Sequence, residues 1–105
     1  DQNILSVGVD SNQNYMQPGS VLTSMLKRVD VAVFESMSAG ADLETGVKVL
    51  GLAEEGVGYS LDEYNASLVS DEMKAAVDAA RASIISGDIA VHNYTTDDSC
   101  PVLDF

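Results

Sequence analysis

The sequence has little positive charge, and this shortage excludes one broad class of partner. Only 5 of its 105 residues are Lys or Arg, whereas 17 are Asp or Glu, so the formal net charge is -12. A chain this anionic repels nucleic-acid phosphates and anionic membrane surfaces. The one adjacent basic pair, Lys27-Arg28, is too small to follow a phosphate backbone. We therefore expect no nucleic acid among its partners.

Cysteine, histidine and long apolar runs are also scarce. Cys100 is the only cysteine and His92 the only histidine, which rules out an internal disulfide and a Cys/His metal cluster. Cys100 lies in a polar stretch, where a free surface thiol and a bridge to another chain both remain open. No apolar run reaches the roughly 20 residues that span a bilayer. No signal peptide precedes the first strand-like run, so we expect a mature product or a fragment.

Strand-like and helical patterns alternate along the chain. Short apolar runs predict strands over 4–9, 47–52 and 89–92. Helical spacing of apolar residues predicts helices over 20–39, 59–68 and 71–86. This order favours an α/β fold, with a partial Rossmann-like parallel sheet flanked by helices. Three short strands leave sheet edges uncovered, so we expect further structure to pack against them.

The helix predicted over 71–86 carries the clearest end signals. Ser70 is a suitable N-cap, and Gly87 stands where a left-handed C-cap is expected. Its apolar residues fall on one stripe, which we expect to be buried: Met73, Val77, Ala80 and Ile84. The helix predicted over 20–39 has a similar stripe, with Gly40 as its terminator: Leu22, Leu26, Val29, Val33 and Met37.

Asp10 is the leading candidate for a ligand contact. It ends a predicted buried strand, and in open α/β sheets ligands bind outside the carboxyl ends of the strands. A carboxylate accepts two hydrogen bonds, which suits the two hydroxyls of a vicinal diol. An ordinary loop aspartate that caps its own turn would have the same sequence, so both interpretations stay open.

Lys27 and the Gly56-Val57-Gly58 segment are weaker candidates. Lys27 is either a solvated cation or a donor to a ligand oxygen or to Asp10. Gly56-Val57-Gly58 lacks the further glycines and the Lys-Ser/Thr of phosphate loops, so it is a flexible crossover or a backbone wall beside a ligand. No nucleophile motif or paired-carboxylate constellation is present, so we expect neither an enzyme nor a cofactor.

Several segments closely resemble the basic membrane protein family. They are Val7-Gly8-Val9-Asp10-Ser11-Asn12-Gln13-Asn14, the run VLTSMLKRVDVAV over 21–33, and residues 51–59 and 84–89. The combination of GVDSNQ with TSMLKRVD is specific, and the segments keep the family's order to about His92. The tail from Asn93 to Phe105 has no family counterpart that we can place.

The resemblance implies a fold, a function and a set of site residues. The fold would be that of type I periplasmic binding proteins, with two Rossmann-like lobes around a ligand cleft. Members are lipid-anchored outside the cytoplasmic membrane and deliver nucleosides, often purine nucleosides, to an ABC permease. The family's ribose-binding aspartate falls on Asp10, the lysine of its TSMLKR motif on Lys27, and its glycine-rich crossover on Gly56 to Gly58.

The resemblance also divides the chain. Residues 1–52 would be a β-α-β segment of the C-terminal lobe, 53–92 a crossover and helical segment, and 93–105 a polar tail. The N-terminal lobe with its purine-stacking aromatic residues and the lipobox cysteine are absent, so the chain matches the C-terminal third of such a protein. The alternative is a small autonomous α/β interaction domain that has lost ligand binding and self-associates. For the isolated chain we expect a homodimer, because without the N-terminal lobe the apolar stripe over 71–86 and the open sheet edges would face water.

Overall fold

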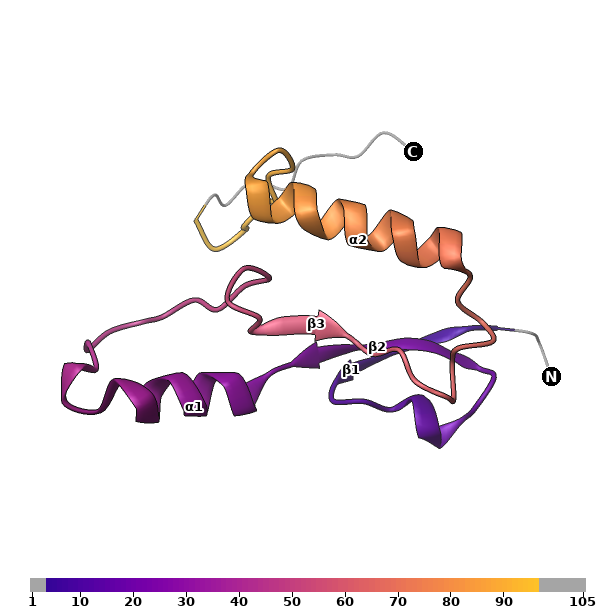
Figure 1. Cartoon of the computed structure of the whole chain (residues 1–105), viewed down its shortest axis with the longest axis horizontal. Helices are drawn as coiled ribbons and strands as arrows, with labels where there is room; N and C mark the ends of the chain where they lie inside the picture. Colours follow the sequence, from indigo (N-terminus) through magenta and orange to yellow (C-terminus); the bar gives the residue numbers. More distant parts are fainter. Residues whose placement is uncertain (1–3, 97–105) are drawn as a thin grey trace.

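The computed structural model describes residues 4–96 and contains a small sheet, two α-helices and two short 3-10 helices (Figure 1). In chain order the elements are β1 (Ser6–Asp10), η1 (Asn14–Met16), β2 (Val21–Lys27), α1 (Val29–Ala39), η2 (Gly40–Asp42), β3 (Val57–Tyr59) and α2 (Asp71–Ser86). Within 4–96, no helix is long and apolar enough to cross a bilayer. Cys100 and most of the predicted tail lie outside the described residues.

The sheet has the order β1-β2-β3, with β2 in the centre. β1 runs parallel to β2, and Asp10 lies opposite Leu26. β3 runs antiparallel to β2, and Val57 lies opposite Lys27. The α/β class and the parallel pairing are therefore confirmed, whereas the third strand makes the sheet only partly parallel.

The helix predicted to begin at 20 was wrong in its first half. Residues Val21–Lys27 form strand β2, and the helix begins only at Val29. Leu22 and Leu26 are four residues apart, a spacing that places them on one face of a strand as well as of a helix. Pairing with strands on both sides decides between the two structures. The predicted end was right, since Gly40 caps α1 with a positive φ of 52°.

Three further predicted elements were also wrong. Residues 47–52 form no strand, and Val47 and Val49 are almost fully exposed. Residues 57–59 instead pair with the second edge of β2, so residues 47–52 form no backbone hydrogen bonds with that strand. The helix predicted over 59–68 is absent: Tyr59 ends β3, and the residues after it form turns, because Asp62 and Asn65 bond to nearby backbone groups. Residues 89–92 have no strand conformation.

The helix α2 was predicted correctly, together with both of its caps. Ser70 Oγ accepts a hydrogen bond from the Met73 amide at 3.2 Å, and Gly87 adopts the left-handed conformation with φ 86°. The predicted burial of its stripe was wrong, because no residue of α2 is buried in this chain. Met73 and Val77 are 42% and 46% exposed. We refer to Met73, Val77, Ala80 and Ile84 as the apolar face of α2.

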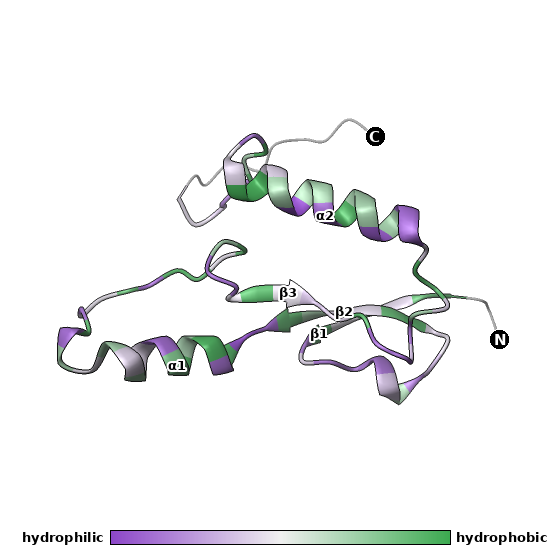
Figure 2. Cartoon of the chain, viewed as in Figure 1, coloured by the Kyte–Doolittle hydropathy of each residue, from purple (hydrophilic) through white to green (hydrophobic). Residues whose placement is uncertain are grey.

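The interior of the described region is polar rather than apolar. Val21 is its only buried hydrophobic side chain, whereas Asn14, Ser24, Ser60 and Asn65 are all buried. The radius of gyration is 16.8 Å, against about 13 Å for a compact domain of this length. Figure 2 shows apolar residues spread along both helices and the strands. The chain alone therefore does not enclose a hydrophobic core.

Candidate functional site

Asp10 and Lys27 form an ion pair at the carboxyl end of the two parallel strands. Lys27 Nζ lies 2.7 Å from Asp10 Oδ1. Asp10 lies opposite Leu26, the residue before Lys27. Because parallel strands end at the same edge of a sheet, this register brings the side chains of Asp10 and Lys27 together. Their side chains are 60% and 62% exposed, so both remain accessible to a ligand from solvent.

The backbone at Asp10 is held in an uncommon conformation. Its φ is 75°, in the left-handed region that Asp and Asn enter more readily than most residues. The chain turns back there, and Gln13 Oε1 accepts a hydrogen bond from the Val9 amide at 3.2 Å. Gly8 makes this close return feasible, since a Cβ at Gly8 would lie 2.8 Å from Gln13 Oε1.

The Gly56-Val57-Gly58 segment borders the same edge from the other side of β2. Val57 lies opposite Lys27, and the Gly56 carbonyl accepts a hydrogen bond from the Arg28 amide at 2.9 Å. A Cβ at Gly56 would lie 2.4 Å from that of Leu50, so no larger residue fits without movement. A Cβ at Gly58 would meet nothing within 4 Å. The structure thus places all of the predicted site residues around the ends of β1 and β2.

Arg28, the second cation of the Lys27-Arg28 pair, forms an ion pair with Asp30. Arg28 Nη2 lies 2.7 Å from Asp30 Oδ2, and Arg28 Nε donates to Asp30 Oδ1 at 2.9 Å. These hydrogen bonds from Arg28 hold the pKa of Asp30 below its usual value, and Asp30 raises the pKa of Arg28. Lys27 is therefore the cation of this edge that pairs with Asp10.

A cluster of polar side chains that joins the loop after β1, strand β2 and the loop after β3 was missed by the sequence analysis. We call it the polar corner; its members are Asn12, Asn14, Ser24, Ser60, Asp62 and Asn65. Ser24 Oγ donates to Asn14 Oδ1 at 2.8 Å, and Asn65 Nδ2 donates to the Leu22 carbonyl at 2.8 Å. The pKa of Asp62 is lowered, first because Asn12 donates to its carboxylate. Asx-rich loops were the only signal available, and they predict turns rather than this cluster.

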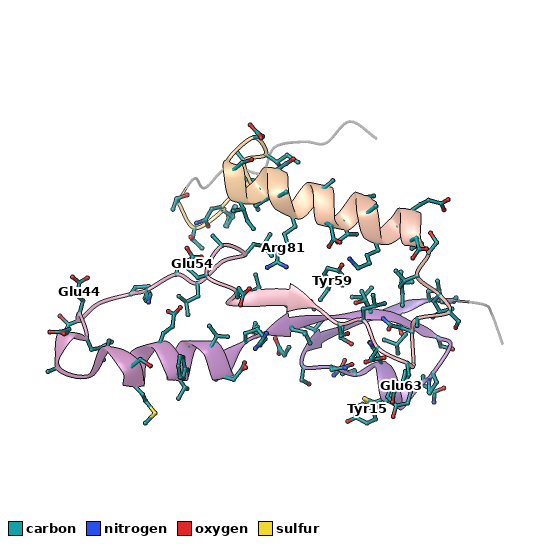
Figure 3. All side chains as sticks on the ribbon, in the orientation of Figure 1. Tyr15, Glu44, Glu54, Tyr59, Glu63 and Arg81 are labelled. Atoms are coloured by element: carbon teal, nitrogen blue, oxygen red, sulfur yellow. The ribbon has the colours of Figure 1, made fainter. Side chains whose placement is uncertain are left out.

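An apolar groove of about 810 Å³ separates β3 from α2. Val57, Gly58 and Tyr59 line it on the sheet side, and much of the apolar face of α2 lines the other. Figure 3 shows Tyr59 and Arg81 pointing into the space between the two elements. Tyr59 Oη donates to Asp78 Oδ1 at 3.1 Å and so links β3 to α2. Burial, followed by this bond to Asp78, raises the pKa of Tyr59.

Asp78 also accepts a hydrogen bond from Lys74, one turn earlier on α2. This bond and the one from Tyr59 lower the pKa of Asp78. The described residues contain no group of three or more His, Cys, Asp or Glu that could hold a metal ion.

Comparisons with known proteins find relatives of this chain by fold and by sequence. Among solved structures, a solute-binding protein of an ABC transporter from Aeropyrum pernix K1 superposes with a TM-score of 0.63. The superposition covers 90% of this chain and 35% of that protein, at 24% sequence identity. This chain therefore shares its fold with about a third of that protein.

By sequence, the chain is 34% identical over 91 residues to basic membrane protein D of Borreliella burgdorferi, which covers 81% of this chain. It is 40% identical over 57 residues to uncharacterized lipoproteins of Pyrococcus abyssi and Pyrococcus horikoshii. No family model matches the sequence. The chain is related to the basic membrane proteins, which confirms the resemblance drawn from its motifs. It spans about a quarter of basic membrane protein D and 14% of each lipoprotein.

Proposed function

We propose that this chain is a C-terminal segment of the substrate-binding component of an ABC importer, and that the longer protein binds nucleosides without chemical turnover. The solute-binding fold and the relationship to basic membrane protein D support a binding role. The lipoprotein relatives support an extracytoplasmic location with a lipid anchor. The solute-binding neighbour from an ABC transporter supports an ABC permease as partner. Purine nucleosides are the proposed ligands by resemblance to the family.

One observation carries the proposal: the open ion pair between Asp10 and Lys27 at the carboxyl ends of parallel strands. The Asp10 carboxylate would accept hydrogen bonds from the 2′- and 3′-hydroxyls of a ribose. Lys27 would hold that carboxylate in its orientation, or donate to a sugar oxygen. Gly56, Val57 and Gly58 would form a backbone wall beside the ligand, and the base would lie against the rest of the protein.

Calorimetry on the longer protein with a panel of nucleosides tests this proposal. The variant Asp10→Ala should lose about 2–4 kcal/mol of binding free energy, because charge-assisted bonds to two hydroxyls disappear. For the same reason, 2′,3′-dideoxynucleosides should bind the wild-type protein poorly. Glu35→Gln is the matched control, since it breaks another exposed ion pair, with Lys48, away from this edge. Equal affinity of the Asp10→Ala and wild-type proteins would refute the site.

A self-associating interaction domain is the second candidate. The exposed apolar side chains favour it, among them Val33, Phe34 and Met37 of α1 and Val77 of α2. Exposed apolar patches of this kind mark interaction surfaces, and a second copy of the chain would cover them as a homodimer. Light scattering across a dilution series decides this point, because a constant monomer mass would rule the homodimer out.

A further inference from the structure

The loop that follows β1 folds back over the sheet and carries Asp10 at its start. Two hydrogen bonds fix the return: Val9 N donates to Gln13 Oε1 at 3.2 Å, and Gln13 N donates to Ser24 Oγ at 3.0 Å. Asp10 lies between these two anchored positions, in its left-handed conformation. The direction of its side chain therefore depends on how firmly residues 9–13 are held.

Asp62 holds this loop from a distant part of the sequence. Its Oδ2 accepts hydrogen bonds from Asn12 Nδ2 at 2.7 Å and from Asn14 Nδ2 at 3.1 Å. These partners are 50 and 48 residues away along the chain. Figure 3 shows Tyr15 and Glu63, the sequence neighbours of Asn14 and Asp62, at the same corner of the molecule. Asp62 thus ties the loop after β1 to the loop after β3.

The loop that presents Asp62 is itself anchored. The Asp62 amide donates to Asn65 Oδ1 at 2.8 Å, and Asn65 Nδ2 donates to the carbonyls of Leu22 and Ser60. Asn14 and Asn65 are completely buried, and within residues 4–96 no buried side-chain nitrogen or oxygen lacks a partner. A buried polar network whose members are all satisfied is rigid, and it loses that rigidity when one member is removed.

We propose that Asp62 is a positioning residue of the ligand site, which acts through Asn12 and Asn14 to hold Asp10 in its binding orientation. This inference rests on the proposed function, since it assigns Asp62 a role at the same site. Asp62 makes its contacts to Asn12 and Asn14 rather than to the binding carboxylate. A change at Asp62 should therefore alter ligand affinity only through the hydrogen bonds that Asp10 makes to the ligand.

Comparison of Asp62→Asn with Glu63→Gln in the longer protein tests the inference. Asp62→Asn keeps the size of the side chain but directs an amide donor at Asn12 and Asn14. Glu63→Gln makes the same change of charge at the next, exposed residue of the loop. Calorimetry would compare a ribonucleoside with its 2′,3′-dideoxy analogue for each variant, alone and combined with Asp10→Asn.

The expected result is a loss of hydroxyl discrimination. Asp62→Asn should weaken ribonucleoside binding about 10-fold, the value of one lost hydrogen bond, and leave the dideoxy analogue unchanged. In the Asp10→Asn background it should have no further effect, because both changes act on the same contact. A merely structural role would weaken both ligands equally and add to Asp10→Asn, and that outcome would overturn the inference.

Amide hydrogen exchange gives a readout that needs no ligand. The amides of Val9 and Gln13 should exchange about 10-fold faster in Asp62→Asn and at the wild-type rate in Glu63→Gln. Unchanged exchange in Asp62→Asn would overturn the positioning role even in a protein that binds nucleosides. Failure of nucleosides to respond to Asp10→Asn would instead refute the proposed function.

Discussion

The polar corner and the apolar face of α2 differ in where their partners lie. Every buried amide and hydroxyl of the polar corner has its hydrogen-bond partner within this chain. The apolar face of α2 has no such complement, since none of its residues is buried. Because apolar burial is the main driving force of folding, the comparison indicates that this segment specifies its polar geometry but not its hydrophobic core.

The largest expected effect is the loss of stability when a charge replaces Val77, in the apolar face of α2. In the longer protein that we propose, the rest of the chain covers the apolar face of α2, so Val77→Asp should cost on the order of 3–5 kcal/mol of unfolding free energy. Urea denaturation would measure it, with Ala79→Asp on the opposite side of the helix as the control. Unfolding of Val77→Asp at the wild-type midpoint would show that the face stays open to solvent.

The next effect concerns the buried hydroxyl of the polar corner. Ser24→Ala leaves the Gln13 amide and Asn14 Oδ1 without a partner, and should cost about 2–3 kcal/mol. Ser36→Ala removes a hydroxyl that bonds the Ala32 carbonyl on the exposed side of α1, and should cost little. Equal losses of unfolding free energy for the two variants would contradict the prediction that the buried hydrogen bonds of the polar corner stabilise the fold more than an exposed one does.

A smaller effect is expected at the glycines beside the binding edge. Gly56→Ala should cost about 1–3 kcal/mol, since the new Cβ would collide with the Leu50 side chain and backbone. Gly58→Ala, two residues away in open space, should change stability little. Thermal unfolding of the pair measures the difference, and the same pair in calorimetry shows whether Gly58 borders the ligand.

The smallest expected effect is the acid response of Asp62. Its pKa in the folded protein lies below the ordinary value of 3.8, so its ionised form is the one that the fold stabilises. That contribution is present above the unfolded pKa and is lost as the pH falls through the lower, folded pKa. The difference in unfolding free energy between wild type and Asp62→Asn should therefore be constant near neutral pH and disappear below about pH 4. Urea titrations across this range would measure the difference, and a difference that persists in acid would contradict the role of the carboxylate.

Local signals account for the parts of the fold that were predicted. The helix α2 follows from its apolar period, its N-cap Ser70 and its C-cap Gly87, all within one stretch of sequence. The strand β2 was mistaken for a helix because the spacing of Leu22 and Leu26 suits both, and only the neighbouring strands decide between them. Residues 47–52 show the converse, an apolar run that gains no strand partner.

The candidate site was predicted for two different reasons. Asp10 follows from its place at the end of a strand. Lys27 was considered as a donor to Asp10 although its element was misassigned, and the resemblance then pointed to both residues. The ion pair between them agrees with one of the interpretations left open from the sequence. Asp62 could not be found in this way, because its partners Asn12 and Asn14 lie about fifty residues away and only the folded chain brings them together.

The left-handed backbone at Asp10 also limits what the position can accept. Glycine and asparagine tolerate such a φ at low cost, but neither carries a negative charge. Glutamate carries the charge, but it enters this region less readily and would place its carboxylate one methylene further from the strand. Aspartate alone satisfies the backbone and the charge together. Among substitutions at this position, Asp10→Asn therefore separates the two demands most cleanly, because it keeps the turn while it removes the charge and replaces one acceptor oxygen with a donor.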